Sequence, residues 1–489
     1  MFDKIIPEKA GISSTRVLEF INTLEKRGLP MHSILMMKGN DIFAEYYWLP
    51  FSENFCHRMY SQTKSFVGVA IGLLEQDGLL GLDDKIHTFF PDKIDTDLPE
   101  NLKELTVRDM LMMQTCGDTP SWFYDKDPDR THIYFNRNQA NMAPGMRWHY
   151  DSPGSQVLST LVERLSGMSL FDFLKTRIFD HIGTFKTAYM LKTKTDDTFG
   201  DSAMLCTTQD VASFARFVMN YGSWQGRQII NEKYMREATS RLADNCESGF
   251  DGVFTHGYGY QIWRYGDDGF AFNGMGSQLT ICLPKQDFIF TCTADTQGYE
   301  EAKALILTAL QDIIIDHLGS PLPEDPEAAA LCEARGKQLK LCKIKGEAYS
   351  PAMDEISGVT YICDDNLAGF KKFTLHFEGK GGRLCYTNAQ GDKELAFGLG
   401  ENVFTKFPQQ GYSDDHAGLL AVDHLYDCAV SAAWAEERKL LIKVQVIDKY
   451  FGNAIWVFSF KGDKATISMR KHAEAFLDEY VGEVIATKA

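Results

Sequence analysis

Hydrophobic positions change their spacing along the chain, and each change predicts a different element. Apolar residues recur on one face at helical spacing in residues 14–27. Residues 32–38 and 41–48 have the composition of strands and flank Gly39-Asn40, a two-residue hairpin signal. The chain is therefore expected to begin with a helix and a β-hairpin.

Residues 61–77 form a mainly apolar stretch that stops at Gly78, which predicts a buried helix. A further helix is expected at 300–318. Between these helices the pattern predicts strands at 258–265, 269–273, 278–283 and 288–293. Because the strands come as neighbours in sequence, residues 1–318 are predicted to form an α/β (α+β) domain whose sheet is mostly antiparallel and flanked by helices.

The pattern changes in the last third of the chain. Residues 319–330 are Pro-rich and acidic, and the linker is expected to cover 319–349. Residues 350–489 are predicted to be an antiparallel β-domain, either a barrel or a sandwich, with a short helical stretch at 471–482. Alternating segments in this part are 373–377, 383–387, 440–447, 455–460 and 465–469.

Composition and charge narrow the partners and the compartment. The 489 residues carry a formal charge of −17, which disfavours a nucleic-acid partner. No apolar run reaches the length of a membrane-spanning helix, so no membrane partner is expected. The 11 cysteines include no C-x-x-C pair, and the first residues lack the pattern of a secretory signal. We therefore expect free thiols and a cytoplasmic protein.

The sharpest chemical feature is Ser61-Gln62-Thr63-Lys64 at the start of the apolar helix. Positions i and i+3 lie one helical turn apart, so the Lys64 amine is expected to reach the Ser61 hydroxyl. The helix N-terminus favours a developing negative charge and supplies backbone N–H groups for an oxyanion. A lysine among apolar neighbours can act as a base. Ser61 is thus the predicted nucleophile.

The S-x-x-K pattern alone is weak, because it recurs at Ser468 and Lys471. Both occurrences can be ordinary surface pairs. Their surroundings distinguish them, since Ser61 opens a buried helix whereas Ser468 leaves an alternating strand and enters a charged stretch. We therefore assign the chemistry to Ser61 and Lys64.

Tyr150-Asp151-Ser152 is the second feature, on a predicted turn before a helix. A tyrosine beside Ser61 can move a proton between the nucleophile and the leaving group. The alternative is a half-buried tyrosine with a structural hydrogen bond. Tyr134 is a rival of similar form, and His149 is interpreted as a neighbour because no acidic partner completes a Ser/His/Asp triad.

The third feature is a glycine-broken strand with Asn273, Gly274 and Met275. Glycine in a strand permits the close approach of a ligand or of another backbone segment. Met275 is expected to give the second oxyanion N–H group, and Asn273 and Gly274 to contact substrate. Taken alone, the same residues also fit a plain β-turn.

Motifs for a bound metal, nucleotide or other cofactor are not found. The sequence has no H-E-x-x-H, G-x-S-x-G, Walker A or G-x-G-x-x-G pattern, and its 12 histidines are dispersed. We therefore expect no metal and no cofactor.

Together, the order S-x-x-K, Y-x-S and glycine-containing strand resembles the serine β-lactamase and penicillin-binding-protein superfamily. The likeness runs through residues 10–317 and is greatest to the class C-like branch, which holds esterases, D-amino-acid peptidases, amide-oligomer hydrolases and acyltransferases. Residues that carry it include MYSQTKSFVGVAIGLL, LTVRDMLMMQTCG, PGMRWHYDSPGSQVLSTLVERLSG, TTQDVASFARFVMNYGSWQGRQII, GYGYQIW and NGMGSQLTICLP. The C-terminal domain resembles the lipocalin-like β-modules appended to some members.

The resemblance implies a role for each matching position. Ser61 takes the place of the acylated nucleophile, Lys64 that of its base and Tyr150 that of the proton-shuttling tyrosine. Ser152 stands where the family usually has Asn, and Gly274 matches the glycine of its Lys-Thr-Gly strand.

Three positions depart from the family pattern. Phe272 occupies the place of a Lys or His that holds the substrate carboxylate, so recognition of β-lactams is in doubt. Cys116 replaces a frequent Ser, and Asp151 is unusual within the tyrosine motif.

The leading hypothesis is a serine hydrolase that acts through an acyl-enzyme on a small ester or amide. The alternatives are an acyltransferase with the same Ser61 acyl-enzyme and a catalytically inactive, penicillin-binding-like binding protein. Trp122 is expected to line the substrate pocket, although it can also simply pack against the domain. Homo-oligomerisation stays open.

Overall fold

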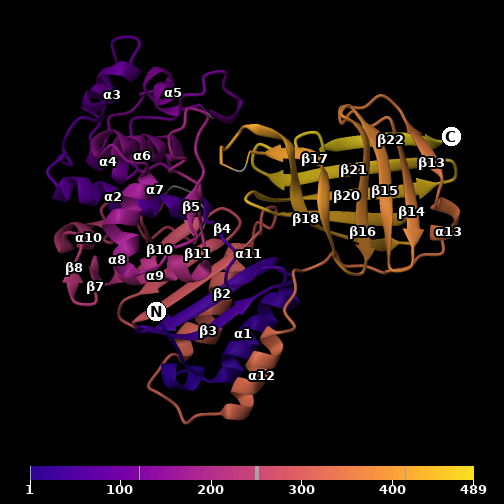
Figure 1. Cartoon of the computed structure of the whole chain (residues 1–489), viewed down its shortest axis with the longest axis horizontal. Coiled ribbons are helices and arrows are strands. Elements are labelled where there is room, and N and C mark those ends of the chain that lie inside the picture. The colour runs from indigo at the N-terminus through magenta and orange to yellow at the C-terminus, as the bar shows by residue number, and fades with distance from the viewer. Residues whose placement is uncertain (1, 121, 248–252, 414) are drawn as a thin grey trace. The chain divides into compact units, whose positions relative to one another are not determined.

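The computed structural model describes residues 2–120, 122–247, 253–413 and 415–489, which form two compact units (Figure 1). The first unit contains Met1–Thr296, Glu300–Lys340 and Asp415–Ala417. The second contains Gln297–Tyr299, Leu341–Asp414 and Gly418–Ala489. The first unit is an α/β domain, and the second is a closed β-barrel.

A seven-stranded sheet forms the centre of the first unit in the described part of the chain. Its strands are β1 (Asp3–Lys4), β2 (Met31–Lys38), β3 (Asp41–Tyr47), β9 (Trp263–Tyr265), β10 (Gly269–Gly274), β11 (Gln278–Leu283) and β12 (Phe288–Ala294). They lie in the order β1-β3-β2-β12-β11-β10-β9, and every pair except β1–β3 is antiparallel. The predicted mostly antiparallel sheet is confirmed.

Short strands complete the first unit. They are β4 (His57–Arg58), β5 (Tyr189–Met190) and β6 (Met204–Cys206), which pair with one another, and β7 (Ser223–Trp224) with β8 (Arg227–Gln228). Because β4 lies just before Ser61 and pairs with β6, it brings residues near 204 beside the start of the apolar helix.

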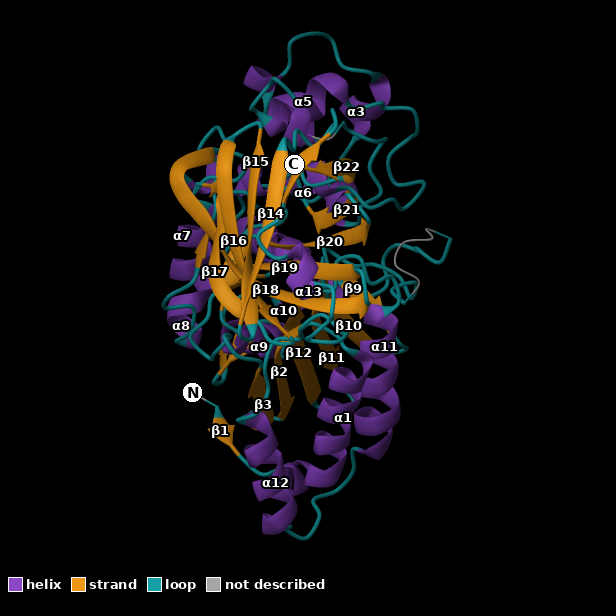
Figure 2. Cartoon of the chain, turned by 90° about the vertical axis from the view of Figure 1, so that its right-hand side faces the viewer, coloured by secondary structure: helices purple, strands orange, loops and turns teal. Residues whose placement is uncertain are grey.

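Helices cover both faces of the sheet (Figure 2). Ile34 and Met36 of β2 face α1 (Ser14–Arg27), α11 (Ala302–Ala309) and α12 (Pro326–Gly336), whereas Leu35 and Met37 belong to the core on the other face. That second core includes α2 (Thr63–Gln76), α6 (Ser152–Ser166), α9 (Thr208–Met219) and α10 (Glu232–Ala238). The remaining helices of this unit are α3 (Glu100–Glu104), α4 (Val107–Leu111), α5 (Arg130–Arg137), α7 (Leu170–Leu174) and α8 (Asp180–Ile182).

The side chain of Phe66 anchors α2 in the core. It stacks on Phe214 at a centroid distance of 3.9 Å, meets Phe179 and Phe185 edge to face, and is 0% exposed. Replacing Phe66 with Ala is expected to lower the free energy of unfolding of this unit by about 3–5 kcal/mol, because a cavity replaces the ring. Chemical denaturation followed by circular dichroism measures the change. Leu79→Ala, at a side chain that is 45% exposed, is the control, and equal losses in the two variants would contradict the expectation.

The second unit is built from ten strands among the described residues. They are β13 (Thr360–Cys363), β14 (Lys372–Glu378), β15 (Gly381–Asn388), β16 (Gly391–Leu399), β17 (Val403–Tyr412), β18 (Leu420–Glu436), β19 (Lys439–Ile447), β20 (Phe451–Lys461), β21 (Lys464–Ala473) and β22 (Gly482–Lys488), with one short helix, α13 (Met353–Ile356). Their order is β16-β15-β14-β13-β22-β21-β20-β19-β18-β17, and a second pairing of β16 with β18 closes the ring. Buried aromatic rings fill this unit, as where Trp456 stacks on Tyr480 at 5.2 Å.

The linker predicted over residues 319–349 differs in the structure. Residues 319–340 belong to the first unit, and α12 forms within them. Asp325 caps this helix by accepting a hydrogen bond from the Ala328 N–H at 3.0 Å, and Cys332 is buried in the core beside α1. The Pro-rich acidic composition favoured a linker, but the segment contains a helix. The start of this helix is specified by an N-cap aspartate followed by proline.

Two other predicted elements are wrong in extent or type. The strand expected at 258–265 is limited to β9, because Gln261 adopts a left-handed backbone conformation with φ of 59°. The helical stretch expected at 471–482 begins inside β21, where pairing with β20 holds Lys471 to Ala473 extended. Sheet pairing overrides local helical preference there.

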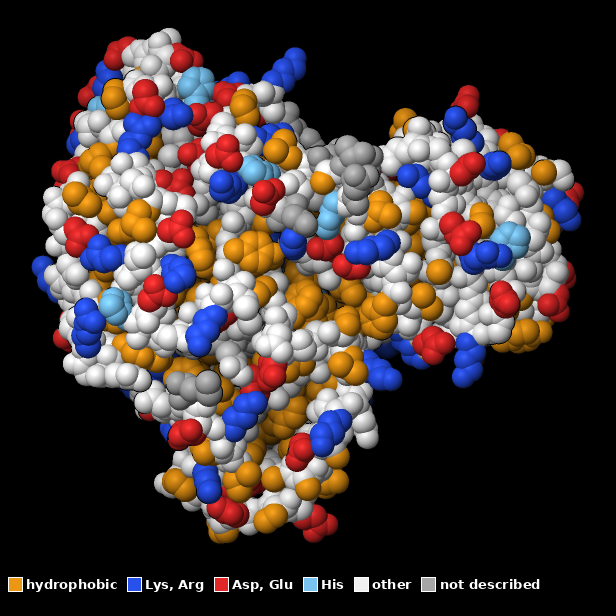
Figure 3. Space-filling model, viewed as in Figure 1, with side chains coloured by type: hydrophobic (Ala, Val, Ile, Leu, Met, Phe, Trp, Pro, Cys, Tyr) orange, Lys and Arg blue, Asp and Glu red, His pale blue; other side chains and the backbone are white. Residues whose placement is uncertain are grey.

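The molecular surface carries charges of both signs (Figure 3). Acidic and basic side chains are interspersed over the face of each unit that Figure 3 shows. Among the described residues, no helix combines the length and apolar character needed to cross a membrane.

Candidate active site

Ser61 lies in a short 3-10 turn, Tyr60–Gln62, that leads directly into α2. Its side chain is only partly buried, so its hydroxyl is not sealed inside the core. The preceding residue, Tyr60, has a φ of 47°, a left-handed conformation that a bulky residue rarely adopts. Such strained positions concentrate at functional sites, where the surrounding structure holds them in place.

Lys64 lies one turn further along and points back to Ser61. Its Nζ atom donates a hydrogen bond to Ser61 Oγ at 3.0 Å and another to the backbone carbonyl of Asp201 at 2.8 Å. The residue is 2% exposed. The sequence spacing predicted this approach of amine and hydroxyl, and the burial follows from the apolar helix around it.

The second S-x-x-K pair has a different geometry. Ser468 and Lys471 lie on β21, where residues three apart point to opposite faces of the sheet. Lys471 donates to the carbonyls of Glu474 and Phe476, each at 2.8 Å, and pairs with Asp478. Its amine is thus engaged in shaping a turn and is directed away from Ser468.

Tyr150 lies beside Lys64. The Lys64 Nζ atom is 5.1 Å from the centroid of the Tyr150 ring, and that ring stacks on Trp263 of β9 at 5.7 Å. Ser152 is the first residue of α6 and therefore stays close to Tyr150 in the chain. The rival Tyr134 is 0% exposed, and its hydroxyl donates to Asp151 at 3.3 Å. Of the two tyrosines, Tyr150 is the one beside the Lys64 amine.

The contacts of Asp151 explain why an aspartate stands at this unusual place in the tyrosine motif. Its buried carboxylate caps α6 by accepting from the Gly154 N–H at 2.9 Å, and it accepts from Thr115 Oγ1 at 2.8 Å. Thr115 Oγ1 is also 2.9 Å from His149 Nε2. Burial raises the pKa of Asp151, while the hydrogen bonds from Gly154 and Thr115 oppose that shift. The carboxylate fixes the start of α6, and with it the position of Tyr150.

The turn between β10 and β11 packs against the segment that carries Ser61. A Cβ atom on Gly274 would lie 2.4 Å from the carbonyl oxygen of Met59, so only glycine permits this approach. Met275 is in the turn, and its carbonyl accepts from Gln278 Nε2 at 2.8 Å. Asn273 is 5% exposed at the end of β10. The expected oxyanion role of Met275 and the substrate contacts of Asn273 and Gly274 stay predictions.

Phe272 and Cys116 belong to the protein interior. Phe272 is 0% exposed and packs 5.7 Å from Phe214, centroid to centroid. Cys116 is buried, and burial raises the pKa of its thiol to about 12. Phe272 thus fills a core position and brings no charge to bind a substrate carboxylate, and Cys116 stays a neutral thiol.

Trp122 packs against a buried arginine. Its ring centroid is 2.9 Å from the guanidinium carbon of Arg130, and it meets Phe199 edge to face at 5.3 Å. Trp122 is 9% exposed. This contact fits the packing alternative, and a substrate-lining role for Trp122 stays a prediction.

Arg130 and Asp201 were not singled out from the sequence. Arg130 pairs with the Asp201 carboxylate at 3.3 Å, and the Asp201 carbonyl receives the Lys64 amine. Neither residue belongs to a local motif, and their contact joins segments far apart in the chain. The charge of Arg130 can be read in the sequence, but it does not identify a partner.

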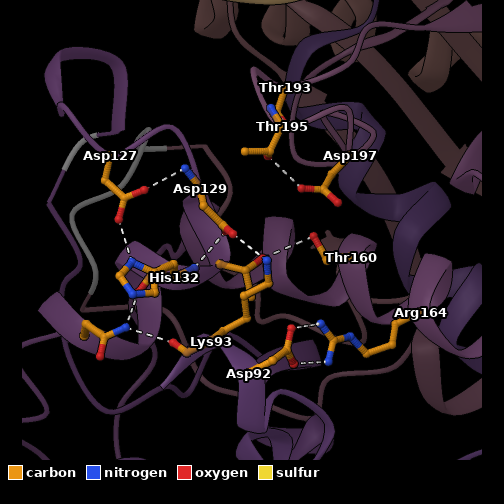
Figure 4. A network of polar contacts seen from close by, with 12 residues as sticks. Asp92, Lys93, Asp127, Asp129, His132, Thr160, Arg164, Thr193, Thr195 and Asp197 are labelled. Atoms are coloured by element: carbon orange, nitrogen blue, oxygen red, sulfur yellow. Dashed lines mark hydrogen bonds and ion pairs between the residues drawn. The ribbon is translucent and has the colours of Figure 1, made fainter. Parts of the chain in front are cut away.

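His132 lies near the start of α5 and points to Asp127 (Figure 4). Its Nδ1 atom is 2.6 Å from Asp127 and its Nε2 atom is 3.0 Å from Asp95. Hydrogen bonds that the ring donates to Asp95 and then to Asp127 raise the pKa of His132 above its ordinary value of 6.5. A raised folded-state pKa means that the stabilisation is fully present below the unfolded-state pKa and disappears as the pH rises through the folded-state pKa.

Replacing His132 with Asn is therefore expected to lower the free energy of unfolding by about 0.5–1 kcal/mol near pH 5.5 and by much less near pH 9. The expected loss in the free energy of unfolding is small because solvent screens the ion pair: the Asp95 side chain is 65% exposed. Denaturation midpoints at the two pH values measure the effect. His317→Asn, at an exposed histidine, is the control. An equal loss at both pH values would show that the ion pairs contribute nothing.

Comparison with known proteins identifies the class. The Beta-lactamase family model matches residues 19–312, more than half of the chain. The chain therefore belongs to the Beta-lactamase family of serine hydrolases.

Individual relatives are distant. The 6-aminohexanoate-dimer hydrolase of Paenarthrobacter ureafaciens is 23% identical over 263 residues, which are 50% of this chain and 67% of that protein. A beta-lactamase of Yersinia enterocolitica is 25% identical over 165 residues, 32% of this chain and 41% of that protein, so the chain spans less than half of its length.

A solved structure shares the fold over both units. The octameric penicillin-binding protein homologue from Pyrococcus abyssi superposes with a TM-score of 0.51 and 16% sequence identity. The match covers 97% of this chain and 99% of that one. At this level of identity the likeness establishes the fold alone.

Proposed function

We propose that this protein is a serine hydrolase that acts through an acyl-enzyme on Ser61, with a small ester or amide as substrate. The observation that carries the proposal is the 3.0 Å hydrogen bond from Lys64 Nζ to Ser61 Oγ at the start of a buried helix. An amine at this distance can take the hydroxyl proton as the oxygen attacks a carbonyl carbon.

The reaction would proceed in two steps. In the first, Ser61 Oγ bonds to the substrate carbonyl carbon, its proton passes to Lys64, and the C–O or C–N bond to the leaving group breaks as Tyr150 delivers a proton to that group. In the second, water adds to the acyl carbon and gives up a proton to the Lys64–Tyr150 pair, and the Ser61 ester bond breaks as the pair returns that proton to Ser61 Oγ. Backbone N–H groups of Ser61 and Met275 would hold the oxyanion in both steps.

The substrate class follows from the charge of the site. Phe272 supplies no cation at the position where β-lactam-binding members hold a carboxylate, so a neutral acyl group fits better than a penicillin. One relative is by its name a hydrolase of the 6-aminohexanoate dimer, an amide. A short aliphatic ester or amide is therefore the proposed substrate of this chain.

A substrate panel tests the function. It contains p-nitrophenyl acetate and butyrate, D-aminoacyl p-nitroanilides, the 6-aminohexanoate dimer and a penicillin. We expect turnover of an ester or a simple amide, no turnover of the penicillin, and inactivation by a fluorophosphonate. Absence of both turnover and covalent adduct would favour an inactive binding protein instead. Products formed in the presence of an added alcohol or amine distinguish hydrolysis from acyl transfer.

A further inference from the structure

The second hydrogen bond of Lys64 joins its amine to the backbone of Asp201. Lys64 Nζ donates to the backbone carbonyl of Asp201 at 2.8 Å, although Asp201 also has a carboxylate on its side chain. A carboxylate against the amine would stabilise the charged ammonium and oppose its action as a base. The structure instead offers Lys64 a neutral carbonyl.

The Asp201 carboxylate forms an ion pair with a buried arginine, Arg130. Asp201 Oδ1 is 3.3 Å from an Arg130 guanidinium nitrogen, and the side chains of Arg130 and Asp201 are 4% and 10% exposed. With water excluded, the two opposite charges compensate each other, and the cost of leaving either one alone is high. The carboxylate of Asp201 is thus engaged with Arg130.

Arg130 is itself fixed from several directions. Its guanidinium carbon is 2.9 Å from the Trp122 ring centroid and 3.7 Å from that of Phe199. The same guanidinium donates to Gln156 Oε1 at 3.4 Å. Gln156 Oε1 also accepts from the Gly200 N–H at 3.1 Å, so α6 holds the residue just before Asp201.

The start of α5 holds the arginine in place. Arg130 is the first residue of α5, and Asp129 caps that helix by accepting from the His132 N–H at 3.0 Å. Lys93 pairs with Asp129 at 2.5 Å, which ties the cap to a second segment (Figure 4). Arg130 is therefore positioned by the backbone as well as by its ring contacts.

We propose that Arg130 is a positioning residue of the hydrolase site, one that withdraws the Asp201 carboxylate so that Lys64 meets the Asp201 carbonyl. This inference rests on the proposed function, because it assigns Lys64 the role of base. It adds that the charge balance between Arg130 and Asp201 sets the electrostatic surroundings of the Lys64 amine. Trp122 and Phe199 then serve to hold the arginine.

Other polar groups around Lys64 are part of the same charge balance. Ser61 Oγ accepts from the amine at 3.0 Å, and the centroid of the Tyr150 ring lies 5.1 Å from it. Arg58, from β4, donates to the Ser202 carbonyl at 2.9 Å, so a second cation adjoins the segment that contains Asp201. Because these groups are left intact in the variants below, changes in the pH profile report on Arg130 and Asp201.

The test measures the rate of covalent labelling of Ser61 by a fluorophosphonate as a function of pH. Arg130→Gln leaves the Asp201 carboxylate uncompensated, which stabilises the Lys64 ammonium, so the midpoint of the acid limb is expected to move up by roughly half a pH unit or more. Asp201→Asn leaves the arginine cation uncompensated, and the midpoint is expected to move down by a similar amount. The double variant R130Q/D201N should return close to the wild-type midpoint, and R130K should lie between wild type and R130Q.

Matched controls separate positioning from general damage. Arg164 of α6 pairs with Asp92 at 2.9 Å near the surface, so R164Q removes a similar charge pair outside the site and should leave the profile unchanged. If R130Q does not fold, the downward shift in D201N and its reversal in the double variant still test the inference. Shifts of the same sign in R130Q and D201N, or no shift in either, would overturn the inference. Wild-type labelling at a residue other than Ser61 would instead contradict the proposed function itself.

Discussion

Replacing Ser61 with Ala is expected to reduce ester hydrolysis by about 10⁴- to 10⁶-fold, down to the rate supported by binding alone. The variant lacks the oxygen that Lys64 holds at 3.0 Å, so no acyl-enzyme forms. The fold should persist, because Ser61 is partly exposed in a short turn and its removal leaves no large cavity. Steady-state kinetics on the best p-nitrophenyl ester measures the loss.

Ser468→Ala is the matched control for this variant. Ser468 has the same S-x-x-K spacing, but it lies on β21 with its lysine bound to Asp478. We expect wild-type rates from the control. A Ser61→Ala enzyme that keeps more than about a hundredth of the wild-type rate would exclude Ser61 as the nucleophile.

Replacing Lys64 with Met is expected to lower kcat by about 10²- to 10⁴-fold with little change in KM. Methionine keeps the length and the apolar stem of the side chain but removes the amine. Ser61 then has no adjacent base, and the Asp201 carbonyl loses its buried donor. The acid limb of the pH–rate profile should disappear with the amine, and the profile is the measurement that identifies a base.

Lys471→Met serves as the counterpart in the barrel. Its amine shapes a turn through Glu474 and Phe476, so the variant should lose stability in the second unit and keep its turnover. A Lys64→Met profile with an unchanged acid limb would mean that another group takes the proton from Ser61.

Elements with strong local signals could be predicted from the sequence. Helix α1 carries apolar residues at helical spacing and ends at Arg27, where Gly28 with a φ of 70° caps it, and its observed bounds match the prediction. The hairpin of β2 and β3 turns at Gly39, and alternate residues of β2 belong to opposite cores. In the site, the reach of Lys64 to Ser61 needed only helical geometry.

What depends on distant contacts could not be predicted. The composition of β18 is also compatible with a helix. Its pairing with β17, β19 and β16 makes it a strand. The glycine at 274 was recognised, but the partner of its close approach, Met59, is set by the tertiary fold. The pairing of Asp201 with Arg130 could not be predicted for the same reason, because no spacing in the chain reveals a buried ion pair.

Peptide mapping of the covalent adduct is the most direct test of the hydrolase mechanism. The native protein is treated with a fluorophosphonate, digested and examined by mass spectrometry. Attack by a serine activated through its neighbouring lysine predicts one adduct per chain, on Ser61, with a labelling rate that falls sharply in Lys64→Met. An adduct on another residue, or a Ser61 adduct that forms equally fast without the Lys64 amine, would contradict that mechanism.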